Sequence, residues 1–131
     1  MTVISAPPTD SLLRFALRLD ATLSGLLGLA LAAAAGPLAR LTGFTPTQEY
    51  LAGAAMVLYG VVVFRLAGLA SVRRAGVGVA IANLVATVAA VALVASAALP
   101  LTTLGVTALI VSAVYTGVFA LMQYLGVRRM T

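Results

Sequence analysis

The chain has 131 residues and a net charge of +5, and its composition is 63% hydrophobic and only 8% charged. A soluble domain is roughly 45–50% apolar and 25% charged, and a core that hides this apolar majority would need more volume than so short a chain encloses. These values exclude a water-soluble globular domain and predict a protein whose solvent is the lipid bilayer.

Four apolar stretches are each long enough to cross a hydrocarbon core of about 30 Å, which takes about 20 helical residues. We therefore predict an all-α membrane protein, a four-transmembrane-helix bundle with up-down-up-down topology, as a single domain over residues 1–131. A flexible cytoplasmic N-terminus is expected at residues 1–10. The spans are expected at about 11–35, 46–70, 75–99 and 102–127.

Local signals mark the ends of these spans. Thr45, Pro46 and Gln48 have the pattern of a capping box with proline at the first helical position, so the second span is expected to begin before its apolar part. Gly36-Pro37 is typical of a helix end and is expected to stop the first span. The other candidate caps are Thr9, Asp10 or Ser11 for the first span and Thr102 or Thr103 for the fourth.

Arginine placement predicts the orientation through the positive-inside rule. Arg40 lies alone on one side of the four expected spans. We therefore expect both termini in the cytoplasm (N-in/C-in) and a location in a bacterial cytoplasmic (inner) membrane. Ala33-Ala34-Ala35 also resembles a signal-peptide cleavage site, although Asp20 and Pro37 argue against cleavage. On the side opposite Arg40, which is the side expected to be cytoplasmic, lie Arg14, Arg18, Arg65, Arg73, Arg74, Arg128 and Arg129.

One polar side chain from each span falls in a common inner layer. Counting helical rise from the inner boundary gives depths of about 7 Å for Asp20, 10 Å for Arg65, 12 Å for Asn83 and 6 Å for Gln123. These residues form a candidate intramembrane polar cluster, in which Asp20 pairs with Arg65 while Asn83 and Gln123 complete the hydrogen bonds. In the alternative, Arg65 extends to the inner phosphates. Asn83 is expected to face the bundle in either case.

The remaining arginines suggest a lipid-binding surface. Each arginine near anionic headgroups contributes roughly 1 kcal/mol to the attraction between protein and membrane surface. In the alternative, these arginines only determine the orientation of the chain in the membrane. On the other side, the loop is expected to pair Arg40 with Glu49. The candidate anionic-lipid rim comprises Arg14, Arg18, Arg73, Arg74, Arg128 and Arg129.

Small and aromatic residues indicate how the helices are expected to pack. Small residues recur at four-residue spacing, as in Ser112/Thr116, which predicts close helix contacts and little internal volume. Tyr59 and Tyr115 fall near mid-depth, and their hydroxyls need acceptors, so both are expected to face inward and fill space. Phe44, Tyr50 and Tyr124 are typical of the interfacial aromatic belt.

The sequence offers no catalytic or metal-binding constellation. It has no cysteine, histidine or lysine, so this chain alone cannot supply a thiol relay, a histidine-ligated metal site or a lysine Schiff base. Its acidic residues, Asp10, Asp20 and Glu49, lie at different depths or in a tail. We expect a non-enzyme with no catalytic residues, no cofactor, no metal and no nucleic-acid partner.

Four segments resemble a family of small bacterial membrane proteins. They are Arg18-Leu19-Asp20, the run Ser24-Gly25-Leu26-Leu27-Gly28, Gly36-Pro37-Leu38 and Leu58-Tyr59-Gly60. With these segments the chain resembles the four-span, mostly uncharacterised bacterial inner-membrane proteins loosely related to the DoxX group, mainly in its first hairpin. The resemblance implies a four-helix bundle and a bacterial origin and specifies no activity.

Two classes of function follow as hypotheses. The first is a structural or accessory membrane protein that binds lipid or another membrane protein, including a parallel homo-oligomer. The second is a small transporter or channel that uses a membrane-embedded Asp20/Arg65 pair. Small multidrug exporters have an embedded carboxylate that Asp20 would match, but Asp20 is expected to lie close to the inner surface and to lack the aromatic neighbours of such a drug site. The glycine and arginine patterns of small fluoride channels are absent.

Overall fold

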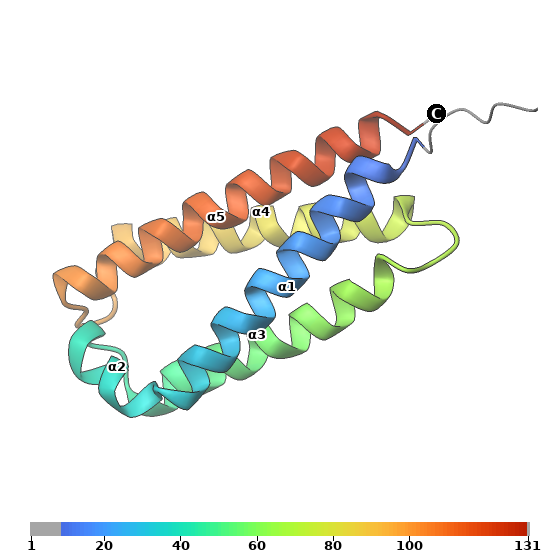
Figure 1. The fold of residues 1–131 in the computed structure, drawn as a ribbon. Helices are drawn as coiled ribbons and strands as arrows, with labels where there is room; N and C mark the ends of the chain where they lie inside the picture. Colours follow the sequence, from blue (N-terminus) through green and yellow to red (C-terminus); the bar gives the residue numbers. More distant parts are fainter. Residues whose placement is uncertain (1–8, 131) are drawn as a thin grey trace, which may run out of the picture.

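The computed structural model describes residues 9–130. In chain order its helices are α1 (Ser11–Ala33), α2 (Ala35–Thr42), α3 (Pro46–Leu66), α4 (Arg73–Ser96) and α5 (Thr103–Arg128) (Figure 1). Helices α1, α3, α4 and α5 each have the length and hydropathy of a membrane span. The predicted all-α bundle of four long apolar helices is therefore confirmed, and it is consistent with four membrane spans. Most of the N-terminus expected to be flexible, residues 1–10, lies outside the described residues.

The short helix α2 corrects the expected end of the first span. Helix α1 ends at Ala33, and Gly36 and Pro37 lie inside α2 instead of terminating α1. Pro37 is the third residue of α2, and the first four N–H groups of a helix have no intrahelical partner. A proline is therefore accommodated there, which explains why this pair does not act as a stop.

Hydrogen bonds at two helix starts confirm the predicted caps. The Thr45 hydroxyl accepts from Gln48 N at 3.0 Å, and Gln48 Oε1 accepts from Thr45 N at 3.0 Å, which completes the capping box of α3. Thr102 Oγ1 accepts from Gly105 N at 3.1 Å and caps α5. Asp10 occupies the cap position of α1, but its side chain makes no cap bond.

The long helices pack in the order α3, α1, α5, α4, which makes an open arc. The closest pairings are α1 with α3 and α4 with α5, and α1 joins the two pairs by packing on α5. No substantial backbone packing links α3 to α4 within residues 9–130. Figure 1 shows α1 crossing between α3 and α5, with both described chain ends at one end of the bundle, the terminal end, and α2 at the other, the α2 end.

Glycine permits close contact between the backbones of α1 and α3 where the two helices cross. A Cβ placed on Gly53 would lie 2.6 Å from both Ala32 N and Gly28 O. A Cβ on Gly60 would lie 2.7 Å from Ala21 O. Because lipid supplies no hydrophobic drive between helices, such backbone contact is a main source of their association.

At the α2 end, backbone contacts join the two hairpins. Thr102 N donates to Thr42 O at 3.0 Å, and the Thr102 hydroxyl donates to Leu41 O at 2.6 Å. Gly43 ends α2 with a φ of 84°, a left-handed conformation that favours glycine. Helix α2 therefore fixes the distance between the hairpins at this end.

Candidate functional site

A buried carboxylate, that of Asp20, stands at the centre of the four long helices. Asp20 and Gln123 are completely buried, and Asn83 is 4% exposed. Asn83 Nδ2 and Gln123 Nε2 each donate to Asp20 Oδ2 at 2.9 Å. Asn83 Nδ2 also lies 2.9 Å from Gln123 Oε1. The structure thus brings together three of the four residues expected in the inner polar layer.

Hydroxyl groups complete the set of donors around Asp20. The Tyr59 hydroxyl donates to Oδ2 at 2.6 Å, while those of Ser24 and Tyr115 donate to Oδ1 at 3.0 and 3.1 Å. The carboxylate therefore receives five hydrogen bonds, from α1, α3, α4 and α5. Among residues 9–130, no buried side-chain nitrogen or oxygen lacks a partner. We define Asp20, Ser24, Tyr59, Asn83, Tyr115 and Gln123 as the Asp20 network.

Arg65 takes no part in this network, so the expected Asp20–Arg65 pair is not formed. Its side chain is exposed in the last turn of α3, and the one salt bridge within residues 9–130 joins Arg14 to Asp10. Arg65 follows Tyr59 by six residues, a rotation of roughly 240° around the helix, so Tyr59 faces Asp20 while Arg65 faces outward. This placement fits the alternative in which Arg65 extends to the membrane surface.

Sequence reasoning placed the two tyrosines inward but did not assign them to Asp20. Ser24 follows Asp20 by four residues and therefore shares its helix face, a signal that was available from spacing alone. The tyrosines lacked such a signal because depth fixes the level of a residue and leaves its rotational position open. In the structure the Tyr59 hydroxyl also lies 3.1 Å from Asn83 Nδ2, which links α3 to α4.

A groove between the two hairpins lies next to the Asp20 network. The part of the groove nearest the Asp20 network, which we call its inner part, has a volume of about 450 Å³. It is lined by Ser24, Tyr59, Asn83 and Tyr115 together with apolar residues of all four spans. The outer part of the groove, of about 620 Å³, runs to α2 and the start of α3. Leu27, Met56, Val111 and Ser112 line both parts, so the groove is continuous.

The groove is open rather than filled by side chains. Leu27 and Val111 line it and yet remain 53% and 61% exposed. Small residues such as Ala55, Ala82 and Ala86 form its walls on α3 and α4. The expectation of little internal volume is therefore wrong between the hairpins, where the two helix pairs diverge and small residues leave space. Smaller hollows of about 410 and 280 Å³ also lie along the α4–α5 and α1–α3 pairs.

Glu49 lies at the α2 end of the groove. It is only 5% exposed, lines the outer part, and accepts a hydrogen bond from the Thr42 hydroxyl at 2.5 Å. The expected pairing of Glu49 with Arg40 is not formed within residues 9–130, where Arg40 is exposed. Glu49 is thus a buried carboxylate without an ion-pair partner in the described chain.

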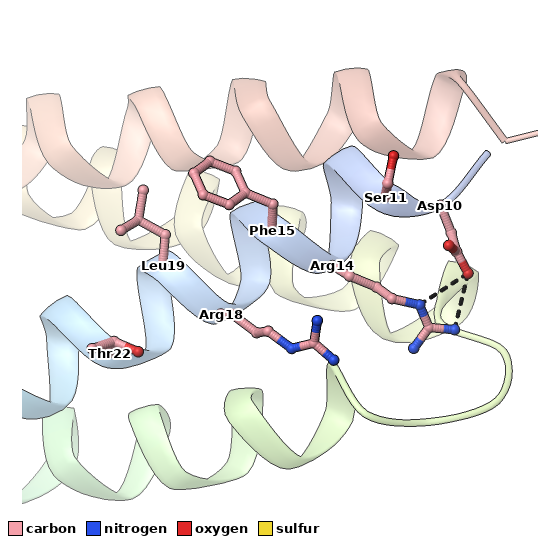
Figure 2. A pocket seen from close by; sticks show the side chains of 7 residues that line it. All are labelled: Asp10, Ser11, Arg14, Phe15, Arg18, Leu19 and Thr22. Carbon is pink, nitrogen blue, oxygen red and sulfur yellow. Dashed lines mark hydrogen bonds and ion pairs between the residues drawn. The ribbon is translucent and has the colours of Figure 1, made fainter. Parts of the chain in front are cut away.

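Arg14 and Arg18 extend from α1 toward the loop between α3 and α4, beside a surface groove of about 540 Å³ (Figure 2). Arg14 donates to Ala67 O at 2.9 Å and Leu69 O at 2.6 Å, and its guanidinium lies 2.9 Å from the Asp10 carboxylate. Arg14 therefore caps the C-terminal carbonyls that follow α3. Arg18 is exposed and makes no hydrogen bond or ion pair within residues 9–130.

The other candidate rim arginines lie at the same end of the bundle. Arg73 donates to Val127 O at 3.3 Å and thereby holds the end of α5. Arg74, Arg128 and Arg129 are exposed. The structure thus separates Arg14 and Arg73, which donate to backbone carbonyls of other segments, from the exposed arginines, among which Arg128 places its guanidinium 5.9 Å from the centre of the Tyr124 ring.

Replacing Arg14 with glutamine is expected to lower the free energy of unfolding in lipid nanodiscs by about 1–2 kcal/mol. Hydrogen bonds to a charged group contribute about 1.5–3 kcal/mol, and partial exposure reduces this value. Arg18→Gln, one turn away, is the matched control and should change stability by less than about 0.5 kcal/mol. Equal effects of the two variants would contradict the assigned capping role.

Comparison with known proteins adds no assignment: no family model, curated protein or solved structure matches the sequence. Within the described residues, no group of three histidine, cysteine or acidic side chains is placed to hold a metal ion. The features of the described chain that bear on function are therefore the Asp20 network and the groove.

Proposed function

We propose that this multi-span membrane protein is a non-enzymatic accessory protein that binds a lipophilic molecule between its two hairpins. The observation that supports the proposal is the continuous apolar groove, whose walls come from all four spans. Binding pockets typically enclose about 300–1,000 Å³ and combine an apolar lining with a few polar groups. The inner part of the groove, at about 450 Å³, falls in this range and ends on polar side chains.

In this proposal the Asp20 network has an architectural role. Its hydrogen bonds hold α3, α4 and α5 against α1 on the terminal side of the groove, while α2 holds the hairpins together at the other end. A polar group in hydrocarbon is costly unless it finds a partner. The network therefore favours one spacing of the hairpins and keeps the groove open between them.

The orientation and lipid contacts of the chain are part of the same proposal. Seven of the eight arginines belong to the terminal end of the bundle, which favours a cytoplasmic position for that end in a bacterial inner membrane. The exposed Arg18 in the surface groove of Figure 2 is suited to an anionic lipid headgroup. A bundle related to the DoxX group would be consistent with this arrangement.

Transport by an Asp20/Arg65 pair receives less support than binding. The two side chains do not meet, and both oxygens of Asp20 are engaged by hydroxyl or amide donors. For Asp20 to act in transport, its carboxylate would have to break several of these hydrogen bonds at once. We therefore retain lipophilic binding as the proposed function.

Filling the groove tests the proposed function. In Ser112→Phe a ring enters the space shared by both parts of the groove, and the one side-chain hydrogen bond that Ser112 makes within residues 9–130 is to Ala108 O of its own helix. We expect this variant to lose most of the lipophilic material that copurifies with the wild-type protein, measured by mass spectrometry of extracts from purified, folded protein. Val118→Phe, at an exposed position of α5, is the matched control and should retain it.

The two variants also define the result that would overturn the proposal. If Ser112→Phe is folded and retains the same bound material in the same amount as Val118→Phe, the groove is not the binding site. Circular dichroism and size-exclusion chromatography of both variants establish that they are folded.

A further inference from the structure

We infer that the groove selects a lipophilic amine, with its cationic head at Glu49 and its apolar chain directed toward the Asp20 network. This inference depends on the proposed function and specifies the chemical class of the ligand. It rests on the charge of the groove, on the surroundings of Glu49 and on the distance between the two ends.

The charged side chain that lines the groove and the one directly behind its lining are both acidic. Glu49 lines its outer part, and Asp20 lies directly behind Ser24, Tyr59, Asn83 and Tyr115 of the inner part. None of the side chains that line either part is basic. A buried carboxylate is costly unless it is paired and hydrogen-bonded. The groove therefore favours a cation and disfavours a fatty acid or other anionic amphiphile.

The surroundings of Glu49 fit an ammonium head. Its one side-chain hydrogen bond within residues 9–130 comes from the Thr42 hydroxyl, which leaves acceptor capacity on the carboxylate. Phe44 lines the same end of the groove, and an aromatic face attracts a cation. The Gln48 side chain lies there too, but its Oε1 already accepts from Thr45 N. Glu49 is therefore the group that would hold the charge.

The dimensions fit a single chain. Glu49 and Tyr59 are ten residues apart on α3, about 15 Å of helix, a distance that a dodecyl chain spans. Between them the groove is lined by apolar side chains such as Leu27, Met56 and Val111. A ligand with its head at Glu49 would thus place its chain end near the hydroxyl groups that surround Asp20.

Three probes of one chain length test the inference: dodecylamine, dodecanol and dodecanoic acid. Binding is measured with isotope-labelled probe on affinity-captured phosphatidylcholine nanodiscs that contain the full chain, and binding to empty discs is subtracted. The wild-type protein should bind dodecylamine about ten-fold or more tightly than dodecanol, the effect of one charge-assisted hydrogen bond. Dodecanoic acid should bind most weakly.

Two substitutions at Glu49 and one beside it identify the group responsible. Glu49→Gln should abolish the preference for the amine while dodecanol binding stays within about two-fold, and Glu49→Asp should preserve the preference. Thr47→Lys, at an exposed site in the same turn, changes the net charge by the same amount as Glu49→Gln and controls for surface potential. It should retain the preference.

Each outcome distinguishes this inference from the proposed function. Equal affinity for the three probes in the wild-type protein, abolished by Ser112→Phe, would overturn amine selection and leave lipophilic binding intact. An amine preference that survives in folded Glu49→Gln would also overturn the inference. Failure of all three probes to bind above empty discs would count against both proposals.

Discussion

Replacing Asp20 with leucine is expected to lower the free energy of unfolding by about 3 kcal/mol. Five hydrogen bonds converge on this carboxylate, and interhelical hydrogen bonds in membranes contribute on average about 0.6 kcal/mol each. Leucine has similar size but removes the acceptor of the Tyr59 hydroxyl and of Gln123 Nε2, while Asn83 Nδ2 keeps Gln123 Oε1 as a partner. Unfolding of the variant and the wild-type protein in the same lipid, followed by circular dichroism, measures the difference.

Two further variants separate a hydrogen-bond centre from an ion pair. Asp20→Asn should be less destabilised than Asp20→Leu, because the side-chain carbonyl oxygen of asparagine can still accept hydrogen bonds. It should be less stable than the wild-type protein, because the NH₂ group of asparagine is a donor and would face other donors. Arg65→Gln should change stability by less than about 0.5 kcal/mol, since Arg65 is exposed. If Arg65→Gln is instead as damaging as Asp20→Asn and exchanging the two charges restores stability, the ion-pair interpretation is correct.

Substituting alanine for two glycines of the first hairpin should have effects of opposite sign. Gly53→Ala places a Cβ 2.6 Å from backbone atoms of α1, so the helices must separate, at a cost of about 1–3 kcal/mol. A Cβ on Gly25 meets nothing within 4 Å. Gly25→Ala should therefore gain up to about 1 kcal/mol from helix propensity. Thermal unfolding in one detergent ranks the two variants against the wild-type protein.

This comparison tests the packing of α1 on α3 directly. Both variants add one methyl group to the same pair of helices, so a general effect of alanine would shift them alike. A Gly53→Ala variant as stable as Gly25→Ala would mean that the close backbone contact at Gly53 is absent in the folded protein.

Most of the fold was predictable because each long span carries its own signals. Apolar length fixed the number of spans, and Thr45 with Gln48 and Thr102 marked two helix starts that the structure confirms. Helical rise also placed Asp20, Asn83 and Gln123 at a common level, and the structure joins them. The properties that could be predicted are those set along the axis of one helix.

The errors concern rotation about the helix axis and the packing between helices. Arg65 has the charge that complements Asp20 but faces away from it, and Tyr59 supplies the α3 contact instead. Helices α1, α3, α4 and α5 are apolar around most of their circumference, so periodicity gives little indication of which face is inside. The same ambiguity concealed the burial of Glu49 and the space between the hairpins.

The helix arc is open between α3 and α4, and this opening determines how the proposed lipophilic ligand would arrive. A lipophilic molecule would enter sideways from the acyl-chain region, having first partitioned into the bilayer, without being released to water at the entrance. Occupancy would then follow the mole fraction of the ligand among the surrounding lipids rather than its aqueous concentration. Affinities measured in discs of different lipid-to-protein ratio should coincide only when they are expressed on that scale.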